Sequence, residues 1–159
     1  MIRVGQGYDV HPFAAGRRLV LGGVEIACAQ GGLAGHSDAD VLAHAIASAL
    51  LGSLALGDLG AHFPDTDPRW KDAASLELLR TVAARLRERG WTLVNCDATV
   101  VAQEPRLAPH VPEMRARLAA VLGVDVEGVS VKATTHEKLG ALGRAEGIAC
   151  HAVVLVEHV

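Results

Sequence analysis

Apolar residues recur along this chain with helical spacing in some segments and strand spacing in others. Between residues 73 and 89 they recur every three or four positions, which predicts an amphipathic helix with Gly90 as its C-terminal stop. Residues 109–122 predict another helix, and the apolar run 41–56 predicts a buried helix that contains His44. The stripe of the first helix consists of Leu76, Leu79, Val82, Ala83 and Leu86.

Segments rich in β-branched residues predict the strands. The four longer ones are residues 2–11, 93–103, 129–134 and 148–157. The last of these is apolar almost without a break, as a strand covered on both faces would be. Residues 19–21 and 24–26 predict a hairpin, because Gly22-Gly23 between them suits a type I′ turn. Strands interleaved with helices predict an α+β fold (an α/β sandwich) with one mixed sheet and its helices on one face, as a single domain over residues 1–159.

Composition and charge limit the compartment and the partners. The chain has 159 residues, is 50% hydrophobic and carries a net charge of -3, which predicts a substantial core and no nucleic-acid partner. Its three cysteines lack CxxC spacing and indicate buried small hydrophobes in a reducing compartment. No apolar run reaches the roughly 20 residues of a membrane span. The chain starts without a charged-then-apolar leader, so we expect a cytoplasmic protein with no membrane partner.

Only 3% of the residues are aromatic, and the last predicted strand is apolar on both faces. A second copy of the chain could cover the open face of the sheet. In the alternative, the helices suffice and the protein is a monomer. Composition leaves both arrangements open.

An Asp-x-His step near the start of the chain suggests a metal site. Asp9 and His11 are two positions apart in a predicted strand and therefore face the same side. His44 can complete a three-ligand set from the helix expected to begin at Ser37 and Asp40, which form a capping-box-like pair. Three protein ligands leave one position open, as is typical of catalytic zinc. The alternative is an ordinary polar end of a surface strand, and spacing alone does not show that the three residues meet.

Two further segments combine carboxylates or hydroxyls with turn residues. The loop from Gly57 to Pro68 can hold hydroxyls or hard cations, or it can be an Asx-rich turn between helices. Residues 132–137 can bind a diphosphate and its magnesium. Alternatively they form a short helix that is capped by a threonine and has Glu137 in its first turn. The local pattern favours the turn in the first case and the capped helix in the second.

Eight motifs occur in order over nearly the whole chain: RVGQGYDVH, GHSDADVLAH, ALLG, LGDLG, FPDTDP, AQEPRLAPH, VKATTHEKLG and GRAEGIAC. Together they resemble the 2-C-methyl-D-erythritol 2,4-cyclodiphosphate synthase family of the non-mevalonate isoprenoid pathway. The resemblance implies a lyase that cyclises 4-diphosphocytidyl-2-C-methyl-D-erythritol 2-phosphate and releases CMP. The alternatives are a metal-dependent phosphodiesterase and a non-catalytic module that binds zinc or cytidine nucleotides.

The resemblance also implies roles for individual residues. The matching metal ligands are Asp9, His11 and His44 for zinc, and Glu137 for magnesium or manganese. The matching transition-state contacts are His36 and Thr135. The matching substrate contacts are Ser37, Asp58, Leu59, Gly60, Phe63, Pro64, Asp65, Thr66, Asp67, Ala102, Gln103, Glu104, Pro105, Arg106, Leu107, Ala108 and Thr134.

The resemblance further implies a homotrimer with active sites between the chains, so that the free face of the sheet packs inside the trimer. An axial cavity that can take an isoprenoid diphosphate is also implied. The residues that match this cavity are Ala141, Arg144 and His151. The chain departs from the common family pattern at Ala39, Ser48, His136, Ala141 and His151. Family members often have glycine at position 39, aspartate at 48 and glutamate at 151, and none of these positions is an implied metal ligand.

Overall fold

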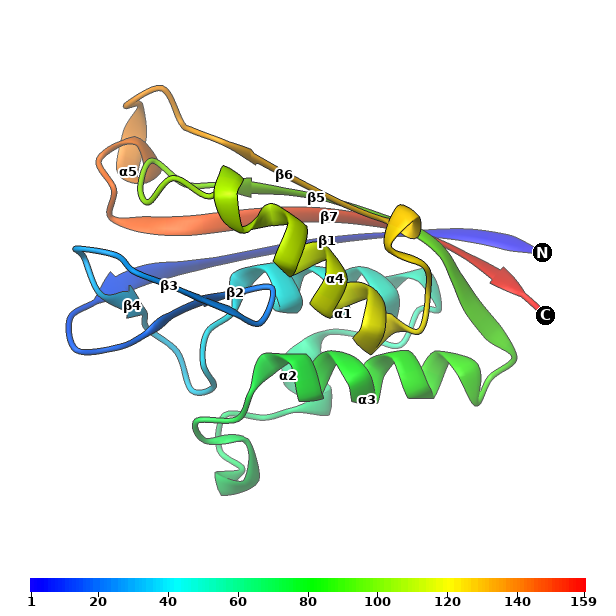
Figure 1. Cartoon of the computed structure of the whole chain (residues 1–159). Coiled ribbons are helices and arrows are strands. Elements are labelled where there is room, and N and C mark those ends of the chain that lie inside the picture. The colour runs from blue at the N-terminus through cyan, green and yellow to red at the C-terminus, as the bar shows by residue number, and fades with distance from the viewer.

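The computed structural model describes residues 1–159 as a mixed sheet with helices on one face (Figure 1). The strands are β1 (Ile2–Ala14), β2 (Leu19–Leu21), β3 (Val24–Ile26), β4 (Gly32–Leu33), β5 (Trp91–Val101), β6 (Val129–Thr134) and β7 (Gly147–His158). The helices are α1 (Val41–Ser53), α2 (Leu59–His62), α3 (Ser75–Arg87), α4 (Val111–Leu122) and α5 (Gly140–Gly143). Three short 3-10 helices are η1 (Pro68–Trp70), η2 (Ala108–His110) and η3 (Val126–Gly128).

The main sheet has five strands in the order β4-β1-β7-β5-β6, and β2 pairs with β3 in a separate hairpin. Strands β5 and β6 are parallel, whereas the other neighbours in the main sheet are antiparallel. Helices α1, α3 and α4 all lie on the same side of this sheet in Figure 1. The predicted α+β class and mixed sheet are therefore confirmed, and the hairpin has the expected positive φ angles of 57° at Gly22 and 75° at Gly23.

Two glycines bring α1 into backbone contact with β1. Gly5 and Gly7 face the helix, and a Cβ atom would lie 1.9 Å from the carbonyl oxygen of Ala49 at the first position and 2.0 Å from that of Ala45 at the second. Only glycine permits this approach. Because side chains alternate along a strand, Asp9 faces the same helix. The close packing thus sets the distance between the polar end of β1 and the helix that carries His44.

The start of α1 differs from the predicted one. Asp40, not Ser37, is the N-cap residue, and its Oδ1 accepts the N–H of Ala43 at 3.0 Å. The amides of Gly22 and Gly23 also donate to this carboxylate, at 2.9 and 2.8 Å. Burial raises the pKa of Asp40 to about 6, against the opposing effect of these amide hydrogen bonds. The capping-box prediction was wrong because Asp40 is held by a hairpin turn that is distant in sequence.

Residues 37–40 form a tight turn before the helix. The Oγ atom of Ser37 accepts the N–H of Ala39 at 3.2 Å, and Oδ1 of Asp38 accepts the N–H of Asp40 at 3.1 Å. Ala39 has a φ of 56°, in the left-handed region that costs a non-glycine residue about 1 kcal/mol. Ala39, where the resemblance implies a common glycine, therefore lies in a strained turn.

The face of the sheet opposite the helices exposes large apolar side chains. Val4 is 64% exposed, Tyr8 49% and Val153 47%. Strand β7 is buried from Gly147 to Cys150, but beyond that alternate residues face solvent. Within one chain, the expected burial of this strand on both faces is therefore not seen. No helix of the chain is both long enough and apolar enough to cross a membrane.

Candidate active site

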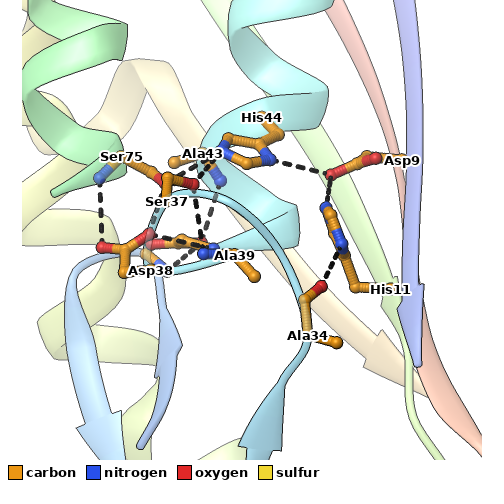
Figure 2. A network of polar contacts seen from close by, with 11 residues as sticks. Asp9, His11, Ala34, Ser37, Asp38, Ala39, Ala43, His44 and Ser75 are labelled. Atoms are coloured by element: carbon orange, nitrogen blue, oxygen red, sulfur yellow. Dashed lines mark hydrogen bonds and ion pairs between the residues drawn. The ribbon is translucent and has the colours of Figure 1, made fainter. Parts of the chain in front are cut away.

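Three candidate ligands from two elements converge at the end of the β1–α1 contact. Strand β1 supplies Asp9 and His11, and α1 supplies His44 (Figure 2). Oδ2 of Asp9 lies 3.0 Å from Nε2 of His11 and 3.0 Å from Nδ1 of His44. All three candidate ligand atoms lie within 4.8 Å of one another. The structure thus brings together, as a possible metal-binding triad, the residues that spacing alone could not show to meet.

The charges and hydrogen bonds of this triad fit a divalent cation. Burial raises the pKa of Asp9, but hydrogen bonds from His11 and His44 outweigh it and lower the pKa to about 2. The hydrogen bond with Asp9 raises the pKa of His11. Nδ1 of His11 lies 2.6 Å from the carbonyl oxygen of Ala34, which only accepts, so this nitrogen carries a proton and Nε2 is turned toward the triad. One carboxylate and two imidazoles are a donor set that suits zinc.

A buried serine lies behind His44. Nε2 of His44 is 2.8 Å from Oγ of Ser75 and 3.2 Å from Oγ of Ser37. Ser75 is 1% exposed, and its hydroxyl also contacts Oδ1 of Asp38. Ser75 was not predicted from the sequence, because a serine near the start of a helix usually acts as a cap. It also lies 31 residues away from His44 in the chain.

A cavity of about 360 Å³, the triad cavity, opens beside the candidate ligands. Trp70 and Leu78, which sequence did not indicate, also line it. Of the predicted substrate contacts and catalytic residues, it is lined by His36, Ser37, Leu59, Gly60, Phe63 and Asp65. The other predicted contacts in this loop, Asp58, Pro64, Thr66 and Asp67, are not among its lining residues.

Two aspartates of this loop act as caps. Oδ1 of Asp58 accepts the N–H of Ala61 at 2.8 Å, at the start of α2. Oδ1 of Asp67 accepts the N–H of Arg69 at 3.0 Å, and Asp67 also forms an ion pair with this arginine, which lowers the pKa of the aspartate. The loop is therefore an Asx-rich connection, as one alternative held, and at the same time forms a wall of the triad cavity.

A second cavity of about 410 Å³, the loop cavity, lies between residues 102–108 and residues 133–135. Its lining contains all the predicted contacts from 102 to 108, together with Thr134 and Thr135. Glu137 lies beside it, because Oγ1 of Thr135 donates to Oε1 of Glu137 at 3.2 Å and accepts the N–H of Glu137 at 3.2 Å. No helix begins at these threonines, so the capped-helix alternative was wrong.

The two cavities share no lining residue. In one chain, His36 therefore belongs to the triad cavity and Thr135 to the loop cavity. Glu137 is not part of the Asp-His-His cluster. The predicted catalytic residues are thus divided between two separate places on the chain.

The residues expected at a trimer axis lie outside the triad, in β7 and in the segment that leads to it. Nε of Arg144 lies 2.6 Å from Oε1 of Glu146 in an exposed ion pair. The ring of His151 lies 4.8 Å from the ring of Tyr8, on the exposed face of the sheet. Ala141 is in α5, which leads toward β7. None of these three residues lines either cavity.

Comparisons with known proteins identify close relatives. The sequence profile of the YgbB family matches residues 2–157. A 2-C-methyl-D-erythritol 2,4-cyclodiphosphate synthase from Syntrophomonas wolfei is 63% identical over 98% of this chain and 99% of its own length. The bifunctional IspDF from Campylobacter jejuni superposes with a TM-score of 0.95 at 44% identity, over 100% of this chain and 43% of that one. A CDP complex of IspF from Plasmodium falciparum superposes with a TM-score of 0.85 at 33% identity, over 99% of this chain and 96% of that one.

Proposed function

This chain belongs to the YgbB family, and we therefore propose that it cyclises 4-diphosphocytidyl-2-C-methyl-D-erythritol 2-phosphate to 2-C-methyl-D-erythritol 2,4-cyclodiphosphate and releases CMP. The observation that carries this proposal is the 63% identity to a synthase of that name over 98% of the chain. Because the relative matches at nearly its full length, residues 1–159 are proposed to act as one catalytic domain.

The proposed reaction is an intramolecular phosphoryl transfer. An oxygen of the 2-phosphate attacks the β-phosphorus, the bond from this phosphorus to the bridging oxygen breaks, and CMP leaves with that oxygen. Both reacting groups belong to one substrate and both are anionic. The protein therefore has to fold the substrate back on itself and to offset negative charge, and it needs no side-chain nucleophile.

The triad cavity is proposed to hold the methylerythritol and its phosphate. Asp9, His11 and His44 would hold zinc, which when bound supplies a Lewis acid for a phosphate oxygen. His36 and Ser37 line the same cavity and can donate hydrogen bonds to a phosphate as its charge develops. The apolar side chains of this cavity, such as Phe63, suit the carbon skeleton of the substrate.

The loop cavity is proposed to hold the cytidine. Seven consecutive residues, 102–108, line it, so the backbone of one loop can recognise a base by its N–H and C=O groups. Thr135 lines this cavity, and its hydroxyl, which donates to Glu137 in the single chain, can turn to donate to the transferring phosphate. The carboxylate of Glu137 would hold magnesium or manganese beside the diphosphate.

The division of the site between two cavities supports the proposed homotrimer. Phosphoryl transfer requires the groups of both cavities at one substrate, but each chain holds them apart. The exposed apolar face of the sheet, with Val4, Tyr8 and Val153, offers the surface that neighbouring chains would bury. We propose that each active site combines the triad cavity of one chain with the loop cavity of its neighbour.

An isoprenoid diphosphate at the trimer axis is a further part of the proposal. Arg144 is exposed, and three copies around one axis would attract such an anion. Its ion pair with Glu146 competes with the ligand. Addition of an isoprenoid diphosphate should raise the melting temperature of the wild type and not that of Arg144→Ala. Equal shifts in both proteins would rule out this role of Arg144.

The test of the function is turnover of the purified protein with zinc and magnesium. Phosphorus NMR should show the cyclic diphosphate and CMP forming together. A linear phosphate ester beside CMP would indicate a phosphodiesterase instead. Binding of cytidine nucleotide without any turnover would indicate a non-catalytic module.

A further inference from the structure

We propose that Ser75 is a positioning residue of the metal site. Its hydroxyl orients His44 so that Nδ1 of the ring faces the metal, and Asp38 in turn orients the hydroxyl. This inference rests on the proposed function, since it takes His44 as a metal ligand. It adds α3 to the elements that build the site.

The geometry places these groups in a continuous row. Figure 2 shows Asp9, His44, Ser75 and Asp38 one after another, joined by dashed contacts. Oγ of Ser75 lies 2.8 Å from Nε2 of His44 and donates its own proton to Oδ1 of Asp38. Oδ2 of Asp38 accepts the N–H of Ser75 at 3.0 Å, and its Oδ1 accepts the N–H of Asp40 at 3.1 Å. Both oxygens of the carboxylate are therefore occupied, and Ser75 is held at two atoms.

The donors and acceptors in this row allow only one direction of proton donation, from His44 to Ser75 and from Ser75 to Asp38. A histidine that binds a metal through Nδ1 needs that nitrogen free of a proton, so the neutral ring carries its proton on Nε2. The carboxylate of Asp38 can only accept, so the hydroxyl proton of Ser75 points to Asp38. The lone pairs of Ser75 then accept the Nε2 proton of His44. The negative charge of Asp38 is in this way connected to the ring, which makes Nδ1 a better metal ligand.

Two serines lie near Nε2 of His44, and their surroundings differ. Ser37 is farther away, at 3.2 Å, accepts the N–H of Ala39 and lines the triad cavity. Ser75 is closer and does not line that cavity. Because Nε2 has a single proton and Ser75 accepts it at the shorter distance, Ser37 does not need to accept it. The hydroxyl proton of Ser37 can then go to Oγ of Ser75, 3.3 Å away, or to a ligand in the cavity.

The other imidazole has no such dependence on a side chain. Nδ1 of His11 is held by the backbone carbonyl of Ala34 at 2.6 Å, which no substitution removes. His44 is therefore the ligand whose orientation depends on a replaceable hydroxyl. A change at Ser75 should affect metal binding through His44 and leave the His11 contact as it is.

The test measures zinc affinity, by competition of the metal-free protein with a chromophoric chelator. Ser75→Ala should weaken zinc binding about 10- to 100-fold, the usual effect of losing an outer partner of a ligating histidine. The matched control is Ser53→Ala, because Ser53 is also buried and its hydroxyl donates to the carbonyl oxygen of Leu50 at 2.7 Å, within α1. This control should bind zinc as the wild type does.

Two further measurements separate orientation from a general loss of structure. The visible spectrum of the cobalt-substituted protein should change in Ser75→Ala and not in Ser53→Ala, since only the former changes the orientation of the His44 ring. Asp38→Asn should also weaken zinc binding, and the double variant should lose little more than Ser75→Ala alone, because both act through one row of hydrogen bonds. Additive losses, or a wild-type cobalt spectrum in Ser75→Ala, would overturn the inference.

The outcomes also separate this inference from the proposed function. If the wild type binds zinc and Ser75→Ala binds it within twofold of the wild type, the role of Ser75 is wrong and the metal site stands. If the wild type itself binds no zinc, the proposed metal site is wrong, and the role of Ser75 is lost with it.

Discussion

The triad cavity and the loop cavity are built in opposite ways. Around the triad cavity, half-buried side chains from β1 and α1 meet, and the buried Ser75 of α3 lies within hydrogen-bond distance of His44. Most of the lining of the loop cavity comes from one continuous stretch, residues 102–108, with residues 133–135 opposite, and its nearby hydrogen bonds are exposed. A site made of side chains from several elements depends on each of them, whereas a site that recognises its ligand through the backbone of one loop, as proposed for the loop cavity, tolerates side-chain changes. The two halves should therefore respond differently to substitution.

The sharpest contrast between the two cavities is expected from His44→Ala. Removal of one of three ligands should abolish stoichiometric zinc and lower turnover by about 10³-fold or more. CMP binding to the loop cavity should persist, because that cavity contains no triad residue. Metal analysis, steady-state kinetics and calorimetry with CMP measure the three quantities.

The control for this variant is His158→Ala, at the far end of β7, where the ring packs against Trp91. It should keep both zinc and turnover. Stoichiometric zinc in His44→Ala would show that the triad is not the metal site. Loss of CMP binding in the same variant would show that the two cavities are not independent.

A smaller but still large effect is expected from Glu137→Gln. The amide keeps the shape of the side chain and removes the charge that would hold magnesium, so turnover should fall about 10²-fold. Zinc content should remain that of the wild type, because Glu137 lies outside the triad. Glu127→Gln, on an exposed turn, serves as the control. Normal turnover of Glu137→Gln at low magnesium would contradict the assignment.

These two variants together test whether the halves come from different chains. His44→Ala damages only the triad half, and Glu137→Gln damages only the loop half. In trimers assembled at random from equal amounts of both, about one quarter of the interfaces would join two intact halves and recover that fraction of the wild-type activity. The measurement is turnover after joint refolding. No recovery, with native mass spectrometry showing mixed trimers, would mean that both halves act within one chain.

The long elements of the fold could be predicted because their periods extend over many residues. Strand β6 begins and ends where the sequence indicated, and α3 differs from the prediction by two residues at each end. Three short elements, β4, α2 and α5, were missed because they are too short for any period to show. Strands β2 and β3 are as short, but the Gly22-Gly23 turn between them indicated a hairpin. The start of α1 was wrong for a different reason, since Asp40 caps both the helix and a remote hairpin turn.

The same distinction holds for the candidate site. Asp9, His11 and His44 could be found because their side chains are unusual at those positions, and the glycines before them on β1 permit the contact with α1. Ser75 could not be found, because its role depends on a neighbour from another helix. The separation of Thr135 from the triad is likewise a property of the tertiary structure. Resemblance implied active sites between chains, and the structure of one chain places Thr135 and the triad cavity apart.

The smallest effect is expected at Gln103, and it tests how far the loop cavity depends on side chains. Oε1 of Gln103 accepts the N–H of Lys138 at 3.2 Å. Lys138 and Glu137 both have positive φ angles, of 61° and 51°, so this hydrogen bond supports a turn that is unfavourable by itself. This hydrogen bond is exposed, so water can replace Gln103 as the acceptor of the Lys138 N–H. Its loss should therefore weaken the free energy of CDP binding by about 1 kcal/mol, which is roughly fivefold in affinity.

Calorimetry with CDP on Gln103→Ala measures this cost, and Gln103→Glu, which keeps an acceptor oxygen, should recover most of the affinity. Zinc content should not change in either variant, since Gln103 lies in the loop cavity. A loss near 100-fold would equal the largest effect expected from Ser75→Ala on zinc. In that case the loop cavity would depend on its side chains as strongly as the triad cavity does, and the contrast between a backbone-built half and a side-chain-built half would have to be abandoned.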